Sequence, residues 1–213
     1  MDGLLGRKLG MTQVFDDKGQ QIPVTLLEVG PCVVLQRGAT AKDGSLALQV
    51  GFADVKEARA TKAAIGHAKK ANTGPKRFVQ EFRAAESDAF QPGDTVTAAI
   101  FQDVAYVDIQ GVTKGRGFQG VVRRHGMAGG PMTHGGHSKR RVGSIGCREF
   151  PGRVHKNKRM PGHMGHVRVT QQNLRIVAVR PDDNLVLVRG CVPGPSGAMV
   201  VVKKSIKKAA KAS

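Results

Sequence analysis

Short runs of alternating or β-branched hydrophobic residues occur near both ends of the chain and predict β-strands. In the first half they cover residues 12–15, 22–29, 32–36, 46–52, 78–82, 95–101 and 104–109. In the second half they cover residues 167–170, 174–180, 185–192 and 199–202. Turn-forming sequences separate the runs, among them Asp16-Asp17-Lys18-Gly19, Lys42-Asp43-Gly44 and Pro181-Asp182-Asp183-Asn184. The pattern predicts a mainly β protein built from antiparallel strands.

Residues 54–77 interrupt this pattern with a stretch rich in Ala and Lys, which favours helix. Asp54 is a candidate N-cap, Gly66 a candidate break, and Gly74-Pro75 a stop signal. We therefore predict one or two helices, inserted into a β-barrel. The barrel is expected to consist of residues 1–53, 78–110 and 171–202, followed by a frayed Lys-rich tail at 203–213.

Residues 111–170 differ from the rest of the chain, because few of them could build a hydrophobic core. They contain 14 of the 28 glycines, six of the seven histidines and 13 Lys or Arg, but a single carboxylate, Glu149. Loops longer than about 12–15 residues without structure of their own are uncommon and are usually functional or disordered. We predict a long basic extension that begins with one short helix at 117–125.

The net charge points to a polyanionic partner. Lys and Arg number 34 against 16 Asp and Glu, which gives a formal net charge of +18. Nucleic acid fits better than a membrane, because no run approaches the roughly 18 apolar residues of a membrane span. The N-terminal sequence lacks the apolar core of a signal peptide, so we expect a cytosolic protein. Three widely spaced cysteines suggest neither a disulfide framework nor a CxxC pair.

Basic side chains on a glycine-rich backbone suit insertion between RNA helices. Glycine lets the backbone approach phosphates closely, and Arg binds phosphate oxygens with two parallel hydrogen bonds. A solvated linker is the alternative, but linkers rarely combine Arg, His and Met with so little Ser and Glu. The candidate RNA-binding residues are Lys114, Arg116, Arg123, Arg124, His134, Lys139, Arg140, Arg141, Arg148, Arg153, Lys156, Lys158, Arg159 and Arg168. Glu149 could pair with Arg148 or Arg153, lie away from the RNA backbone, or accept hydrogen bonds from base or sugar donors, and we favour the pairing.

Residues of this segment could also belong to a dinucleotide site, a zinc site or a catalytic site. Residues 115–120 match G-x-G-x-x-G, but Lys139 stands near the place where a dinucleotide site needs an acid, and no βαβ alternation surrounds the motif. His134-x-x-His137 and His163-x-x-His166, with Cys147 between them, could ligate zinc, yet the neighbouring arginines would repel a dication. Histidines that stack on bases or bind phosphates fit better. General acid–base catalysis needs two titratable groups in contrasting environments, and Glu149 has no second carboxylate beside it. Cys147 with a nearby His could resemble a thiol nucleophile, but no third residue orients the pair.

Several motifs, in order along nearly the whole chain, carry a family resemblance. They are GLLGRKLGMTQVF at 3–15, KGRGFQG at 114–120, THG at 133–135, GSIG at 143–146, PGRV at 151–154, KRMPG at 158–162, RVT at 168–170, NLVLVRG at 184–190 and VPG at 192–194. The chain resembles the universal large-subunit ribosomal protein L3 family of bacterial type. Two departures concern Lys139-Arg140-Arg141-Val142, where the family commonly has His-Arg and Pro, and Glu149, where many members have a methylatable Gln.

The resemblance implies a translation-protein-type β-barrel with a small helical insertion and a long basic loop. The loop would reach toward the peptidyl transferase centre, with its tip formed by Ser144, Ile145, Gly146, Cys147, Arg148 and Glu149. It further implies a cytoplasmic ribosomal protein that binds large-subunit rRNA early in assembly and contacts neighbouring ribosomal proteins. No catalysis, cofactor, metal, membrane or small-molecule substrate is expected.

The competing interpretation is a translation-associated factor or enzyme built on a similar barrel. Such a protein would need a nucleotide site, and the chain contains no G-x-x-x-x-G-K-[ST] loop.

Overall fold

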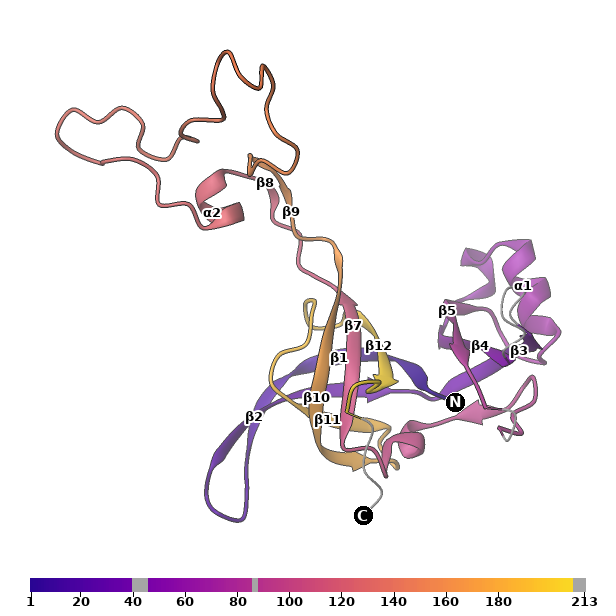
Figure 1. The fold of residues 1–213 in the computed structure, drawn as a ribbon. Coiled ribbons are helices and arrows are strands. Elements are labelled where there is room, and N and C mark those ends of the chain that lie inside the picture. Colours follow the sequence, from indigo (N-terminus) through magenta and orange to yellow (C-terminus); the bar gives the residue numbers. More distant parts are fainter. Residues whose placement is uncertain (40–45, 86–87, 209–213) are drawn as a thin grey trace. The chain divides into compact units, whose positions relative to one another are not determined.

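The chain forms two compact units, which are described separately (Figure 1). One unit comprises Met1–Val112 and Arg168–Ser213, and the other comprises Thr113–Val167. The structure, a computed structural model, describes residues 1–39, 46–85 and 88–208. The turn predicted at Lys42-Asp43-Gly44 and the last five residues of the Lys-rich tail lie outside this range.

Six antiparallel strands of the first unit form a closed ring in the order β1-β12-β7-β10-β11-β2, in which β2 pairs back with β1. The strands are β1 (Gly3–Phe15), β2 (Gln21–Val29), β7 (Tyr106–Val112), β10 (Arg168–Arg180), β11 (Leu185–Arg189) and β12 (Met199–Lys204). Alternate side chains point into the ring, where Leu4, Leu27, Ile109, Val186 and Val202 are fully buried. The prediction of a mainly β protein is confirmed.

Four further strands pair with one another in a second sheet, in the order β5-β4-β3-β6. They are β3 (Cys32–Ala39), β4 (Leu46–Asp54), β5 (Lys76–Arg83) and β6 (Thr95–Val96). Buried Val34, Leu48 and Phe82 of this sheet belong to the same hydrophobic cluster as the ring. Residues 1–53 and 78–110 are therefore divided between two sheets, whereas the sequence predicts one barrel. Hydrophobic alternation marks a strand but does not specify its neighbours.

The helical segment is shorter and more regular than predicted. It contains the 3₁₀ turn η1 (Glu57–Arg59) and α1 (Lys62–Lys69), and α1 continues through Gly66 without a break. Its N-cap is Thr61 and not Asp54, because the Thr61 hydroxyl accepts the Ala64 N–H at 3.3 Å. In none of the described ranges is a helix long and apolar enough to cross a membrane.

Two other strand predictions are corrected by the structure. Residues 98–101 form the 3₁₀ turn η2 (Ala98–Phe101), which buries Ala98 and Phe101, so the predicted strand at 95–101 ends at Val96. Residues 167–170 and 174–180 are not separate strands, because β10 runs from Arg168 to Arg180. A bulge lies between Gln171 and Leu174, where Asn173 has a φ of +56° and donates its N–H to Asp108 Oδ1 at 2.7 Å.

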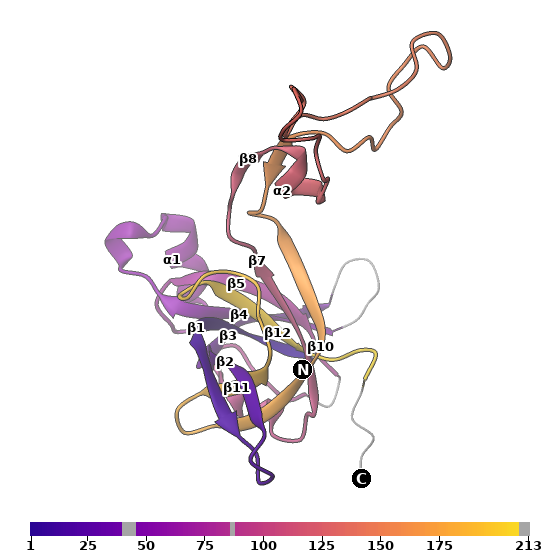
Figure 2. The ribbon, with the colours of Figure 1, turned by 90° about the vertical axis from the view of Figure 1, so that its left-hand side faces the viewer.

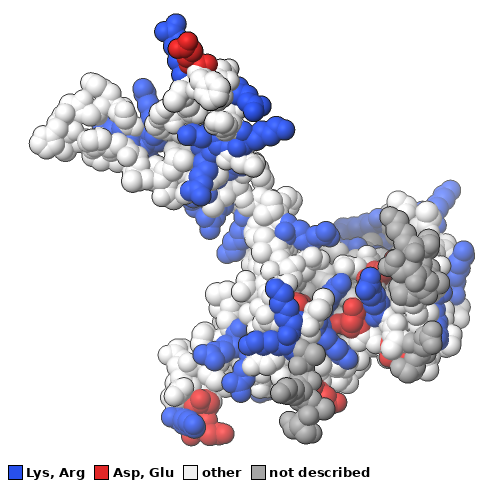
Figure 3. All heavy atoms as spheres, viewed as in Figure 1, with Lys and Arg blue, Asp and Glu red and all other residues white. Residues whose placement is uncertain are grey.

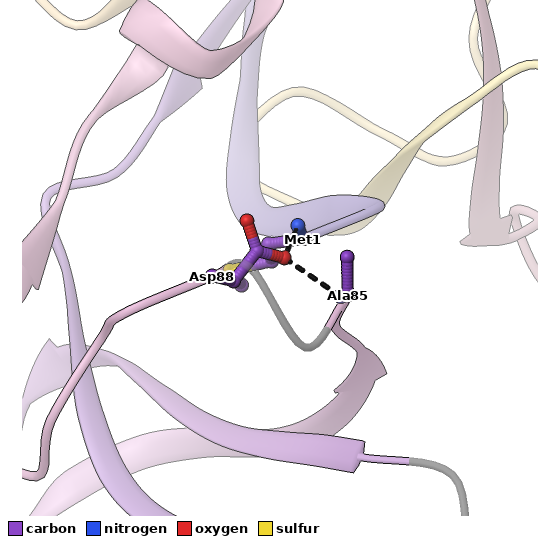
Figure 4. A network of polar contacts seen from close by, with 3 residues as sticks. All are labelled: Met1, Ala85 and Asp88. Atoms are coloured by element: carbon purple, nitrogen blue, oxygen red, sulfur yellow. Dashed lines mark hydrogen bonds and ion pairs between the residues drawn. The ribbon is translucent and has the colours of Figure 1, made fainter.

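Three polar or ionisable groups hold the first unit together at specific points. Buried Lys8 donates from Nζ to the carbonyl oxygens of Val192 at 2.8 Å and Gly194 at 3.1 Å, which satisfies two of its ammonium donors. The Met1 amine forms an ion pair with Asp88, whose carboxylate also accepts the Ala85 N–H at 2.9 Å (Figure 4). Buried Cys32 donates from Sγ to the Leu5 carbonyl oxygen at 3.4 Å, and burial raises the pKa of its thiol to about 12.

Candidate nucleic-acid interface

The Thr113–Val167 unit has very little regular structure of its own (Figures 1 and 2). Strands β8 (Gly117–Gln119) and β9 (Gly162–Met164) form an antiparallel ribbon, and α2 (Val121–His125) follows β8. Residues 126–161 contain neither helix nor strand. The helix predicted at 117–125 therefore begins only at Val121, which is also the one residue of this unit that is fully buried. Hydrophobic packing can contribute little to ordering such a segment.

Hydrogen bonds close the base of the unit. The Thr113 N–H donates to the Val167 carbonyl oxygen at 3.0 Å, and the Arg116 N–H donates to the Met164 carbonyl oxygen at 2.9 Å. Between these bonds Gly165 has a φ of +76°, and a Cβ at this position would lie 2.1 Å from the carbonyl oxygen of Lys114. Only glycine fits here, because both the backbone angle and the close approach exclude a side chain.

The carbonyl oxygen of Met160 connects α2 to the end of the irregular segment. It accepts a hydrogen bond from Arg124 Nη1 at 2.7 Å, and His125 Nε2 lies 3.0 Å from it. Gly162 leaves room for the guanidinium group, since a Cβ there would lie 2.6 Å from Arg124 Nη1. Arg124 is half-buried as a result, and part of its donor capacity is used within the protein.

A tight turn presents the basic triplet Lys139-Arg140-Arg141. The Gly130 N–H donates to the Lys139 carbonyl oxygen at 2.7 Å, and the Arg141 N–H donates to the Ser138 carbonyl oxygen at 2.7 Å. A Cβ at Gly129, which has a φ of +82°, would lie 2.3 Å from the same Lys139 oxygen. Two backbone hydrogen bonds thus hold the turn, while all three basic side chains are exposed.

The remaining candidate residues are also accessible. In the tip segment, residues 144–149, the Ser144 hydroxyl donates to the Gly146 carbonyl oxygen at 3.3 Å. Arg168 lies outside this unit, at the start of β10, and it too is exposed. The exposed candidates within the unit are Lys114, Arg116, Arg123, His134, Lys139, Arg140, Arg141, Arg148, Arg153, Lys156, Lys158 and Arg159.

The charge of this unit is not compensated from within the described chain. Glu149 is exposed and forms no ion pair with any described residue, so the expected pairing with Arg148 or Arg153 is wrong. The ion pairs of the described residues, Met1–Asp88 and Lys76–Asp54, both lie in the other unit. Lys and Arg side chains are spread over the face drawn in Figure 3. Such a surface favours an anion that spans many positions.

The alternative chemistries find little support in the geometry. Across the described residues, no three or more His, Cys, Asp or Glu side chains gather as metal ligands, so His134, His137, Cys147, His163 and His166 do not form a zinc cluster. The G-x-G-x-x-G run leads from the short strand β8 into a helix of five residues, without a βαβ unit.

Two exposed aromatic residues were not among the candidates that the sequence suggested for binding. Phe118 is 75% exposed and Phe150 is 86% exposed, although large apolar side chains are normally buried. Phe118 lies directly opposite His163 in the β8–β9 ribbon. The sequence alone shows that Phe118 is an aromatic residue within a basic segment that has few core-forming residues. It does not show that Phe118 lies opposite His163.

The chain combines a mainly β unit with a basic, glycine-rich unit that lies between β7 and β10 in the sequence. This combination suits a protein that binds an extended polyanion. Comparisons with known proteins identify the family. The ribosomal protein L3 family model matches residues 52–184. The large ribosomal subunit protein uL3 of Geobacillus sp. (strain WCH70) is 52% identical over 209 residues, which cover 98% of this chain and 99% of that protein.

Other relatives agree with that assignment. The uL3 protein of Brachyspira hyodysenteriae is 47% identical, with 98% of this chain and 96% of the relative covered. The uL3 protein of Corynebacterium jeikeium is 48% identical, with 96% and 94% covered. The chain belongs to the ribosomal protein L3 family. The predicted resemblance is confirmed, and the chain is a structural protein of the large ribosomal subunit rather than an enzyme.

Proposed function

We propose that the chain binds large-subunit rRNA through its Thr113–Val167 unit. One observation carries this proposal: every Lys and Arg of the unit except Arg124 is exposed, and its only carboxylate has no ion-pair partner among the described residues. Most protein contacts with nucleic acid are made to phosphate and sugar, and phosphates attract Arg and Lys without regard to base sequence. Glycines on both sides of the basic residues allow the backbone to come close to RNA.

The finer parts of the proposal follow from family membership. The six-stranded ring is a β-barrel of the type found in translation proteins, with residues 54–77 as its helical insertion and 111–170 as the rRNA-penetrating extension. The tip, residues 144–149, approaches the peptidyl transferase centre and supports it without taking part in its chemistry. The protein acts in the cytoplasm, binds early in subunit assembly, and contacts neighbouring large-subunit proteins there.

The experiment compares the salt dependence of binding to a large-subunit rRNA transcript. Each phosphate contact adds roughly 0.7–0.9 to the slope of log K against log salt. Replacing Lys139, Arg140 and Arg141 with Ala should therefore lower the slope by about 2–3 and weaken binding at every salt concentration.

The matched control removes the same charge from α1 and the residue after it, by replacing the exposed Lys62, Lys69 and Lys70 with Ala. We expect a smaller change in slope from this variant. Equal slopes for the two triple variants, or a flat salt dependence of the unmodified protein, would contradict the proposal.

A further inference from the structure

The two faces of the β8–β9 ribbon are occupied differently. Successive residues of a strand point to opposite faces, and residues directly opposite one another in an antiparallel pair share a face. Gln119 pairs with Gly162, and Gly117 pairs with Met164, so these four residues form one face. Phe118 and His163 pair with each other and form the other face.

The α2 helix contacts the first face through one side chain. Arg124 of α2 lies against Gly162, at the place where a Cβ would be, and donates to the carbonyl oxygen of Met160. On this face Gln119, Gly162 and Met164 are partly buried, whereas Gly117 is exposed. Figures 1 and 2 both show α2 beside the ribbon. Phe118 and His163 remain exposed, and no other element of this unit packs on them.

We propose that Phe118 and His163 form a stacking platform for one unpaired base of RNA. This inference rests on the proposed function and adds to it a contact with a base, where the basic residues supply contacts with phosphates. Opposite side chains on an antiparallel ribbon have Cβ atoms about 4.5–5.5 Å apart, which brings two rings together on one face. Unpaired bases stack on such rings, including those of Phe and His.

Size and charge favour a base over a protein partner. Stable protein interfaces bury about 800 Å² on each side, whereas one large aromatic side chain buries about 150–250 Å². Exposed Arg116 precedes β8, exposed Arg123 lies on α2, and no carboxylate of the unit lies on the ribbon or the helix. Phosphates that flank a stacked base would therefore meet cations and no anion. A fully paired helix offers no free base face, so the base must be unpaired.

The chain contains no tryptophan, which makes Phe118→Trp a unique fluorescent probe of stacking. The emission of this variant should be quenched by a large-subunit rRNA transcript with unpaired bases. A fully paired RNA duplex should quench it much less. The matched control is Phe15→Trp, at a position that is 62% exposed and followed by Asp16 and Asp17; its emission should not change.

A second variant, Phe118→Leu, keeps an apolar side chain but removes the ring. Stacking of one base is worth about 1–3 kcal/mol, so this change should weaken binding about five- to 150-fold. The salt slope should stay the same, because no charge is lost. His163→Leu should weaken binding less once Phe118 is already Leu, since the two rings act on one base.

Two results would overturn the platform while leaving the proposed function intact. One is steep, salt-dependent binding of Phe118→Leu with unchanged affinity, and the other is equal quenching of Phe118→Trp by paired and unpaired RNA. Failure of the unmodified protein to bind the transcript at all would overturn both proposals. Unchanged amide exchange of Gly117–Gln119 and Gly162–Met164 in each variant verifies that the ribbon is retained.

Discussion

At the scale of single residues, charged groups divide into those with an internal partner and those without. Lys8 is buried and donates to two carbonyl oxygens, and Asp88 pairs with the Met1 amine. Glu149 has no ion-pair partner among the described residues, and the exposed Lys and Arg side chains around it are equally uncompensated. The first group stabilises the protein, and the second is available to bind an anion.

The Asp88 ion pair predicts a dependence of stability on pH. A hydrogen bond with the N-terminal amine is the main reason that the pKa of Asp88 lies below its ordinary value of 3.8. The folded state thus binds fewer protons here than the unfolded state does, so the pair stabilises the protein above that value. This contribution is lost as the pH falls through the lowered pKa of the folded state.

Asp88→Asn should therefore lower the thermal unfolding midpoint at pH 7, and the difference from the unmodified protein should disappear well below pH 4. Asp183→Asn is the control, because Asp183 is exposed and has no ion pair among the described residues. A difference between Asp88→Asn and the unmodified protein that is as large at pH 3 as at pH 7 would refute this assignment.

At the scale of elements, glycine allows the two backbone segments of the β8–β9 ribbon to approach each other closely. Gly165 immediately follows β9 and faces the carbonyl oxygen of Lys114 and the N–H of Arg116. Gly117 of β8 has a φ of +64°, comparable with the +76° of Gly165, but open space surrounds the position of its missing Cβ. The two positions separate the effect of backbone angle from that of close approach.

Gly117→Ala should destabilise the ribbon by about 1–2 kcal/mol, the usual cost of a left-handed angle in a residue with a Cβ. Gly165→Ala should destabilise it more, because a Cβ would also overlap backbone atoms. Amide exchange of Gly117–Gln119 and Gly162–Met164 measures the effect, and the unfolding midpoint of the ring should not change. Equal exchange in the two variants would show that close approach is unimportant.

At the scale of the whole molecule, the two units differ in what can order them. The ring and the second sheet share one hydrophobic cluster, which includes Leu4, Val50 and Ile109. In the Thr113–Val167 unit only Val121 is buried. Burial of apolar surface is the main favourable contribution to folding, so the second unit must depend on other interactions. Under the proposed function these are contacts with rRNA.

Amide exchange should show this difference directly. In the free protein, the amides of β1, β7 and β12 should be protected, whereas most amides of residues 126–161 should exchange rapidly because they are not paired within a helix or sheet. Addition of a large-subunit rRNA transcript should slow exchange in residues 126–161. Strong protection of that segment without RNA would contradict the prediction.

Much of the candidate site could be predicted because it depends on composition. The concentration of Lys139, Arg140 and Arg141 among glycines, with Glu149 as the only acid, already indicated a polyanion, and the structure shows these side chains exposed. The pairing expected for Glu149 was wrong, since nearness in sequence does not bring two exposed side chains into contact. The contact of Arg124 with Met160 was not predictable, because 36 residues separate them.

The sequence by itself determined the mainly β character, the family and the place of the basic segment, because strand periodicity, motif order and charge are properties of the chain read locally. Only the tertiary structure decided that Cys32–Ala39 and Leu46–Asp54 pair outside the ring, and that Phe118 faces His163. Phe118 and His163 are far apart in the chain, and the exclusion of β3 and β4 from the ring depends on which other strands close it. Such pairings follow from how whole strands pair and pack, and no local pattern specifies them.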